Sequence, residues 1–289
     1  MQSVNATSVS NHCLIDGLAF AEAPRWHNNE LWFSDFYTHR VMRVDGEGRA
    51  HVVVEVPNQP SGLGWLPDGR LLVVSMVDRK LMRLDPTGLV EVADLSGIAS
   101  FHCNDMVVDA KGRAYIGNFG FDIFTKGAPV TPTVLAMVTP EGAVAVAARD
   151  LYFPNGSVIT PDGATLIIAE TYARKLTAFT VAVDGTLSQQ RVWADLSSIA
   201  PDGICLDAEG AVWVASPRSN EFVRVVEGGT IRQRIAVSNQ AIACALGGDD
   251  GRRLFMVIGR VKGRDEAMAT RMGRIEYVDV EVPAAAAPS

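Results

Sequence analysis

The chain has 289 residues, of which 26 are lysine or arginine and 33 are aspartate or glutamate, so its formal net charge at pH 7 is -7. No cluster of basic residues accompanies this acidic balance, which argues against nucleic acid as a partner because phosphate backbones are bound by grouped Lys and Arg. Hydrophobic residues make up 48% of the chain and charged residues 20%, and their mixing along the sequence is typical of a globular protein rather than a disordered one.

The first residues, 1–17, have neither the basic start nor the apolar core of a secretory signal peptide. No apolar run reaches the roughly 18 residues that a membrane helix needs. We therefore expect a cytoplasmic protein without a membrane partner. The cysteines have no CxxC spacing, and we expect reduced thiols rather than disulfides or a thiolate zinc site; they are Cys13, Cys103, Cys205 and Cys244.

A short motif recurs along the chain. It consists of a small or polar residue, a short apolar strand and a turn whose Gly falls eight residues after the first position. The clear copies are SGLGWLPDG (61–69), NDMVVDAKG (104–112), NGSVITPDG (155–163) and DGICLDAEG (202–210). EAPRWHNNE (22–30) has Asn residues in the turn, and ACALGGDDG (243–251) is a weaker copy. Starts at 22, 61, 104, 155, 202 and 243 indicate a repeat architecture.

Each copy is followed by further short apolar strands. The second strand is exemplified by LLVVS (71–75), the third by KLMRLD (80–85) and the fourth by HVVVEV (51–56), with Asp, Pro and Gly in the turns between them. Four strands per unit and six units predict an all-β, six-bladed β-propeller with four-stranded antiparallel blades. We expect one domain over residues 1–289, with flexible tails at 1–12 and 283–289.

Closure of the ring is expected from the alternating strand RIEYVDVEV (274–282), which would pair near the N-terminal segment or complete the sixth blade. The segment before it, KGRDEAMATRMG (262–273), is charged and contains Met residues. It predicts an exposed loop or a short helix, and a lid or a dimer contact is the alternative.

In a propeller the innermost strand of each blade runs along the central channel, so the repeat starts form a ring. Four of them carry carboxylate or amide oxygens: Glu22, Asn104, Asn155 and Asp202. Such a set suits Ca²⁺ best, and Mg²⁺, Mn²⁺ or Zn²⁺ also accept carboxylate oxygen. Asn and Asp also serve as caps and turn residues, but their recurrence at one repeat phase favours a single divalent metal site.

A family resemblance supports this interpretation. EAPRW (22–26), CNDMVVDAKGRAYIGN (103–118), PNGSVITPDG (154–163) and PDGICLDAEGAVW (201–213) resemble the motifs of the gluconolactonase, regucalcin and luciferin-regenerating enzyme superfamily over about residues 18–260. The resemblance implies a six-bladed propeller with one catalytic divalent metal in the channel. It implies metal ligands at Glu22, Asn155 and Asp202, and contact with metal-bound water or substrate at Asn104.

The chain departs from the family just before Asn104. The family often has Arg-Pro there, with the Arg contacting the hydroxyls of sugar lactones, whereas this chain has His102 and Cys103. Specificity for a sugar lactone therefore does not follow from the resemblance. The His102 imidazole can donate to a substrate oxygen or relay a proton, or it can simply fill the channel wall.

Aromatic residues are expected on loops near the same face, and they suggest a substrate less polar than an aldonolactone. They are Phe101, Phe119, Phe121, Phe124, Tyr152, Phe153 and Tyr172. Filling the spaces between blades is the alternative role. Phe119, Phe121 and Tyr152 are taken with His102 and Asn104 as candidate substrate contacts. Asp35 and Glu170, which close second strands, are expected in surface or turn-bonding roles, and reaching the site is the alternative.

These residues predict a metal-dependent hydrolase that opens a small-molecule lactone or ester. Asp202 would be a ligand and the general base, while Asn104 and His102 would orient water or substrate. A phosphotriesterase or fluorophosphatase using the same site is one alternative. A non-catalytic propeller that binds a protein, with a structural metal or none, is another. No GxSxG, HExxH, P-loop or GxGxxG motif points to a different chemistry.

Overall fold

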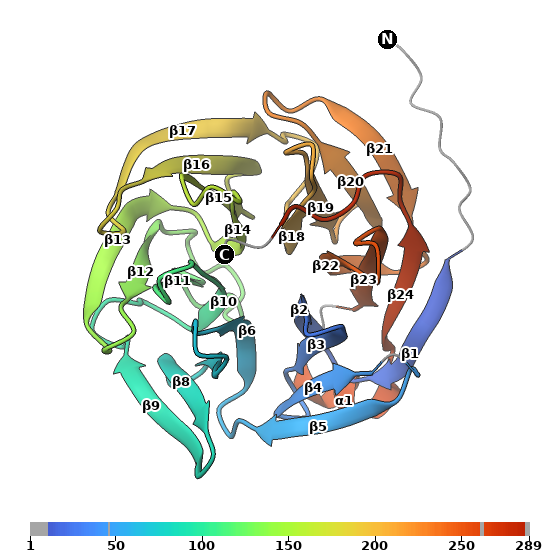
Figure 1. The fold of residues 1–289 in the computed structure, drawn as a ribbon, viewed down its shortest axis with the longest axis horizontal. Helices are drawn as coiled ribbons and strands as arrows, with labels where there is room; N and C mark the ends of the chain where they lie inside the picture. The colour runs from blue at the N-terminus through green and yellow to red at the C-terminus, as the bar shows by residue number, and fades with distance from the viewer. Residues whose placement is uncertain (1–10, 46, 261–262, 287–289) are drawn as a thin grey trace.

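A computed structural model of the chain describes residues 11–45, 47–260 and 263–286. Six four-stranded antiparallel sheets surround a central channel, which confirms the six-bladed β-propeller (Figure 1). Blade one contains β2 (Ala21–His27), β3 (Glu30–Asp35), β4 (Arg40–Val44) and β5 (Ala50–Glu55). Blade two contains β6 (Pro60–Trp65), β7 (Leu71–Ser75), β8 (Lys80–Asp85) and β9 (Gly88–Asp94). Blade three contains β10 (Cys103–Val108), β11 (Ala114–Asn118), β12 (Thr133–Val138) and β13 (Val144–Leu151). Blades four and five contain β14 (Pro154–Ile159), β15 (Thr165–Glu170), β16 (Lys175–Val181), β17 (Leu187–Asp195), β18 (Ile204–Leu206), β19 (Val212–Ser216), β20 (Glu221–Val225) and β21 (Ile231–Ala236).

The sixth blade joins the two ends of the chain. Its sheet order is β1 (His12–Leu18), β24 (Gly273–Asp279), β23 (Arg253–Gly259) and β22 (Gln240–Gly247). The N-terminal strand β1 lies outermost and pairs antiparallel with β24, so β24 both completes the blade and meets the N-terminal segment, as its alternating sequence predicts. A ring closed in this way has no break between its first and last blades.

The C-terminal residues differ from the loose tail that was expected. Ala284 N–H donates to the Gly251 carbonyl at 2.8 Å, Ala285 N–H donates to the Leu206 carbonyl at 3.1 Å, and the Pro283 carbonyl accepts from Ala208. These bonds hold the tail against the propeller. The alanine-rich segment has no apolar periodicity from which such backbone pairing could be predicted. His12, placed in the other expected tail, begins β1. Residues 1–10 and 287–289 lie outside the described residues.

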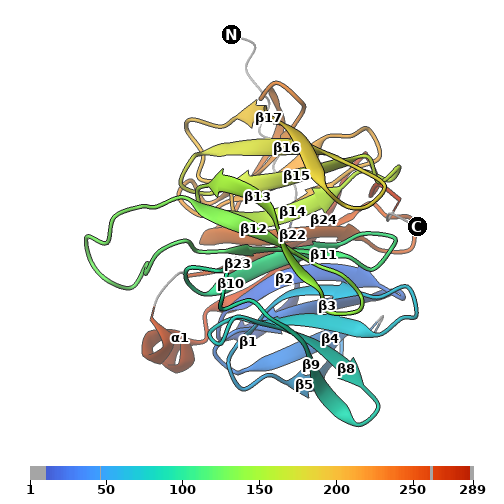
Figure 2. The ribbon, with the colours of Figure 1, turned by 90° about the vertical axis from the view of Figure 1, so that its left-hand side faces the viewer.

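The charged segment before β24 forms a short helix, α1 (Arg264–Thr270), as one of its two interpretations predicts. In Figure 2 α1 and the green loop between β11 and β12 project from the same face of the propeller, and the C-terminus lies on the opposite face. Within the described part of the chain, no helix has the length and apolarity to cross a membrane.

The inner strands pack so closely that glycine is required where they touch. A Cβ on Gly156 would lie 2.5 Å from Ile204 N, and one on Gly203 would lie 2.4 Å from the Ala243 Cβ. Each contact joins residues that lie within one position of each other in the repeat, so neighbouring inner strands start at the same end of the channel, called the upper face below. Because Gly156 and Gly203 follow Asn155 and Asp202 directly, this backbone approach also brings those two side chains to one place.

We predict that Gly203→Ala lowers the free energy of unfolding by about 1–3 kcal/mol, because the added methyl group overpacks the contact between blades five and six. Urea denaturation measures the change. Gly97→Ala is the matched control, since no heavy atom lies within 4 Å of a Cβ at that position. A neutral Gly203→Ala, or equal losses in both variants, would contradict the argument.

Candidate active site

The four candidate oxygen donors lie at the upper ends of inner strands. Glu22, Asn104 and Asn155 are the second residues of β2, β10 and β14, and their exposed fractions are 8%, 5% and 6%. Asp202 precedes β18 and is half-buried; its backbone N–H donates to the Ala215 carbonyl at 3.0 Å. All four polar side chains are therefore withdrawn from bulk water, which is costly unless they have partners.

Asn155 and Asp202 are in direct contact. Asn155 Nδ2 donates to Asp202 Oδ1 at 2.5 Å and to Thr171 Oγ1 at 3.1 Å. The Thr171 hydroxyl donates in turn to the Pro201 carbonyl at 2.8 Å. This chain of hydrogen bonds ties the start of β14 to the residue preceding Asp202, so it holds both side chains in position.

The two carboxyl groups of the ring, Glu22 and Asp202, carry strongly perturbed acidities. Burial raises the pKa of Glu22 well above its usual range, the nearby Asp202 carboxylate raises it further, and the Ala23 N–H hydrogen bond opposes the rise. Burial raises the pKa of Asp202 to about 7, against the hydrogen bond from Asn155. Because Glu22 lies close enough to Asp202 for like-charge repulsion, charging both is unfavourable unless a cation compensates them.

The donor chemistry fits a hard divalent cation. Among the described residues neither Glu22 nor Asp202 forms an ion pair with a basic side chain, and Asn104 Nδ2 is buried without a hydrogen-bond partner. The same part of the chain contains no group of three or more His, Cys, Asp and Glu side chains suited to a metal. A cation here would therefore need amide oxygens from Asn104 or Asn155 in addition to the two carboxylates, a set that Ca²⁺ accepts.

A buried ion pair beneath the ring was not assigned from the sequence. Arg25 Nη2 donates to Asp105 Oδ1 at 2.6 Å and to the Met106 carbonyl at 2.7 Å, which links β2 to β10. The Asp105 carboxylate also raises the pKa values of Glu22 and Asp202, so it lies close enough to influence the ionisation of both groups. Sequence spacing gave no signal for this pair because its members lie 80 positions apart.

Asp35 and Glu170 take the turn-bonding role predicted for them, although both are buried rather than at the surface. Asp35 Oδ1 accepts from Phe20 N–H at 2.8 Å, and Glu170 Oε2 accepts from Tyr152 N–H at 2.8 Å. Each carboxylate ends a second strand and holds the loop that leads into the neighbouring inner strand. They therefore position Glu22 and Asn155 from outside the ring.

His102 lies half-buried beside the ring. Its imidazole stacks on Phe101 with ring centroids 4.3 Å apart, and within the described part of the chain its buried Nδ1 has no hydrogen-bond partner. Burial lowers the pKa of His102, which favours the neutral imidazole. The free Nδ1 is available to a substrate or water, so the substrate-contact and relay roles both remain predictions.

The candidate aromatic contacts divide by burial. Phe119 is 6% exposed and stacks on Phe153 with ring centroids 4.6 Å apart, so it also fills space between blades, as the alternative interpretation predicts. Phe121 is half-buried and meets Tyr172 edge to face at 5.2 Å. Tyr152 is 37% exposed. All three belong to loops at the upper face.

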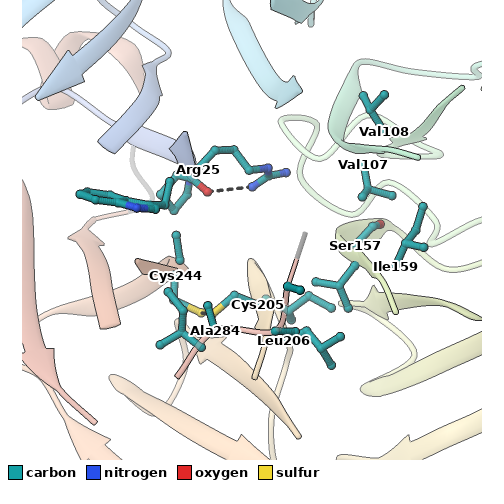
Figure 3. A pocket seen from close by; sticks show the side chains of 17 residues that line it. Arg25, Val107, Val108, Ser157, Ile159, Cys205, Leu206, Cys244 and Ala284 are labelled. Carbon is teal, nitrogen blue, oxygen red and sulfur yellow. Dashed lines mark hydrogen bonds between the residues drawn. The ribbon is translucent and has the colours of Figure 1, made fainter. Parts of the chain in front are cut away.

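The opposite end of the channel has a different character. A cavity of about 210 Å³ is lined there by Arg25, Cys205, Cys244, residues of β10 and β14, and the C-terminal alanines (Figure 3). The two cysteines are free thiols with sulfur atoms 3.6 Å apart. None of the four candidate oxygen donors lines this cavity, so the channel has a polar upper end and an apolar lower end.

Comparison with known proteins identifies the family of this chain. Residues 20–260 match the profile described as the SMP-30/Gluconolactonase/LRE-like region. The chain belongs to this family.

Two curated relatives of the family align over nearly their whole length. The chain is 26% identical to pentonolactonase XacC of Haloferax volcanii, covering 90% of each protein. It is 25% identical to 6-deoxy-6-sulfogluconolactonase of Pseudomonas putida, covering 92% of this chain and 93% of that protein. A crystal structure of regucalcin from Agrobacterium tumefaciens, described as a calcium-binding protein, has the same fold, with a TM-score of 0.79 and 22% identity over 96% of this chain and 95% of that one.

Membership of the SMP-30/gluconolactonase/LRE-like family confirms the resemblance carried by the repeat motifs. All four oxygen donors fall inside the matched region, whereas α1 and β24 lie beyond it. The roles of the four residues are not fixed by the family match and stay predictions of this chain's geometry.

The raised pKa of Asp202 predicts a pH-dependent stability for the metal-free protein. The folded state binds this proton more tightly than the unfolded state, so the free energy of unfolding should fall as pH rises from about 4 towards about 7. Asp202→Asn should lose this part of the pH dependence. Thermal melts of both proteins after chelation measure it.

Added Ca²⁺ should raise the melting temperature of the wild type more at pH 8 than at pH 5, because protons compete for the same carboxylates. For the chelated proteins, the melting temperatures of wild type and Asp202→Asn should diverge between about pH 4 and about pH 7. A difference in melting temperature that stays constant over that range would contradict the proposed burial of a charged pair.

Proposed function

We propose that this protein is a metal-dependent hydrolase that opens a lactone, using one divalent cation, preferably Ca²⁺, held by Glu22, Asn155 and Asp202. The observation that carries the proposal is the pair of mutually repelling carboxyl groups, Glu22 and Asp202, which form no ion pair with a basic side chain among the described residues and lie beside two amide side chains. Membership of a family with relatives named as lactonases supports the reaction class. Glu22 and Asp202 would be stabilised by the cation that makes the site active.

When bound, a divalent cation supplies Lewis-acid polarisation of the ester carbonyl and lowers the pKa of water. Asp202 accepts the proton of the attacking water at a carboxylate oxygen. The water oxygen forms a bond to the carbonyl carbon and the ring C–O bond breaks. The proton held on Asp202 passes to the departing ring oxygen, which completes hydrolysis to the hydroxy acid.

The neighbouring polar groups orient the reactants. Asn104 Nδ2 has no hydrogen-bond partner among the described residues, so it is free to donate to a substrate oxygen. The neutral His102 imidazole, held by stacking on Phe101, has a second unpaired polar atom, Nδ1. Two unpaired polar atoms in an otherwise satisfied region are most readily explained by a ligand that pairs with them.

Asp202→Asn should lower kcat/KM for lactone hydrolysis by about a hundredfold or more, because a general base and a cation ligand are lost together. Rates are measured on a lactone panel after chelation and after re-addition of Ca²⁺, Mg²⁺, Mn²⁺ or Zn²⁺. The variant should not melt at a lower temperature than the metal-free wild type at pH 8, because one of two repelling carboxylates is gone.

Asp16→Asn is the matched control, since Asp16 is exposed on the outermost strand β1. Wild-type activity in Asp202→Asn would refute the assignment. Activity on phosphotriesters but on no lactone would favour the phosphotriesterase alternative. If chelation leaves lactone hydrolysis unchanged, the reaction does not need a bound cation and that part of the proposal is wrong.

A further inference from the structure

Six aromatic rings form a continuous group at the mouths of blades three and four. Phe124 meets Phe101 at 6.3 Å between ring centroids, Phe101 meets Phe119 at 6.3 Å, and Phe119 stacks on Phe153 at 4.6 Å. Phe153 meets Tyr172 at 5.4 Å, and Tyr172 meets Phe121 at 5.2 Å. We call this group, Phe101, Phe119, Phe121, Phe124, Phe153 and Tyr172, the aromatic arc.

The aromatic arc lies against the candidate active site. Phe101 is three residues before Asn104, and Phe153 is two residues before Asn155. Tyr172 follows Thr171, whose hydroxyl accepts a hydrogen bond from Asn155 Nδ2 at 3.1 Å. The arc therefore runs from the side of Asn104 to the side of Asn155 along the upper face.

Two members of the arc, Phe124 and Tyr172, are exposed to solvent. Phe119 and Phe153 at its centre are 6% and 7% exposed, whereas Phe124 is 64% exposed and Tyr172 is 41% exposed. Among the described residues, the exposed large apolar side chains that are aromatic are Phe124, Tyr152 and Tyr172, and all three belong to upper-face loops of blades three and four. Aromatic surface gathered beside a polar site is typical of ligand binding rather than of random exposure.

Asn118 and Asp122, at the loop that carries three members of the arc, are engaged in holding that loop. His102 Nδ1 is the unpaired polar atom already described beside Phe101. The Asn118 amide bonds to Gly120 N–H at 3.0 Å and to the Val134 carbonyl at 2.9 Å. The Asp122 carboxylate accepts from Phe124 N–H at 2.9 Å and from the Thr125 hydroxyl at 2.7 Å. A polyhydroxylated ligand lying on the arc would lose water from its hydroxyls and gain few hydrogen bonds in return.

We propose that the aromatic arc sets the substrate class: the lactones opened at this site carry an aromatic substituent that packs against Phe124 and Tyr172, in place of sugar hydroxyls. This inference rests on the proposed lactonase function. Phe124 and Tyr172 act as specificity-determining residues, and the reacting ester is held by the polar ring beside them. The aromatic substituent would pack offset or edge-to-face against these two rings, in the geometries that the rings of the arc already adopt with one another.

The test compares three five-membered lactones with the same kind of alkoxide leaving group: γ-butyrolactone, γ-phenyl-γ-butyrolactone and a pentono-γ-lactone. Values of kcat/KM with the Ca²⁺-loaded full chain are divided by the uncatalysed rate of each lactone. We expect the phenyl lactone to exceed the other two by about tenfold, the size of effect that ring contacts and their buried area supply.

Phe124→Ala and Tyr172→Ala should each lower the value for the phenyl lactone about fivefold and leave γ-butyrolactone unchanged. Phe124→Leu should keep part of the preference. Val183→Ala is the control, because Val183 is 84% exposed in the turn between β16 and β17, away from the upper-face loops. Melting temperatures establish that every variant is folded.

The outcomes separate this inference from the function on which it rests. If no lactone is hydrolysed with any cation, both the proposed function and the inference that rests on it are wrong. If lactones are hydrolysed but the pentonolactone equals or exceeds the phenyl lactone, the inference alone is overturned. It is also overturned if Phe124→Ala and Tyr172→Ala lower the rates on all three lactones equally.

Discussion

The close approach of neighbouring inner strands is the constraint on which the site depends. Side chains at 155 and 202 come from different blades, yet their polar atoms lie 2.5 Å apart because Gly156 leaves room for the backbone that carries Asp202. A methyl group at Gly156 or at Gly203 would force the blades apart at the level of the oxygen donors. The glycines of the repeat therefore serve both the packing of the propeller and the assembly of the ring.

This assembly works against the stability of the metal-free protein. Glu22 and Asp202 are held near each other in surroundings that raise both pKa values, while the neighbouring Asp105 has its charge matched by Arg25. Asp35 and Glu170 hold the loops that lead into the inner strands of Glu22 and Asn155. A pair of neighbouring carboxyl groups that form no ion pair among the described residues is the arrangement expected of a site preorganised for a cation.

Sequence periodicity was sufficient to predict the fold and the place of the four oxygen donors at the starts of inner strands, because a propeller converts a repeat phase into a position on the channel. Glu22, Asn104, Asn155 and Asp202 were found in this way. The Arg25–Asp105 pair was not, since it joins non-adjacent blades and has no repeat counterpart. The C-terminal tail was assigned as loose because its anchoring uses backbone hydrogen bonds, which any sequence can form. The division of the aromatic residues into buried and exposed members depended on loop conformations that no periodic pattern encodes.

The central claim is that Glu22, Asn104, Asn155 and Asp202 surround a single divalent ion. It is tested most directly by growing crystals of the full chain with Mn²⁺ and measuring anomalous scattering at the manganese edge. The account predicts one strong anomalous peak within coordination distance of Glu22, Asn155 and Asp202 oxygens, lost in crystals of Asp202→Asn. No peak at the ring, with the four side chains still buried and ordered, would contradict it.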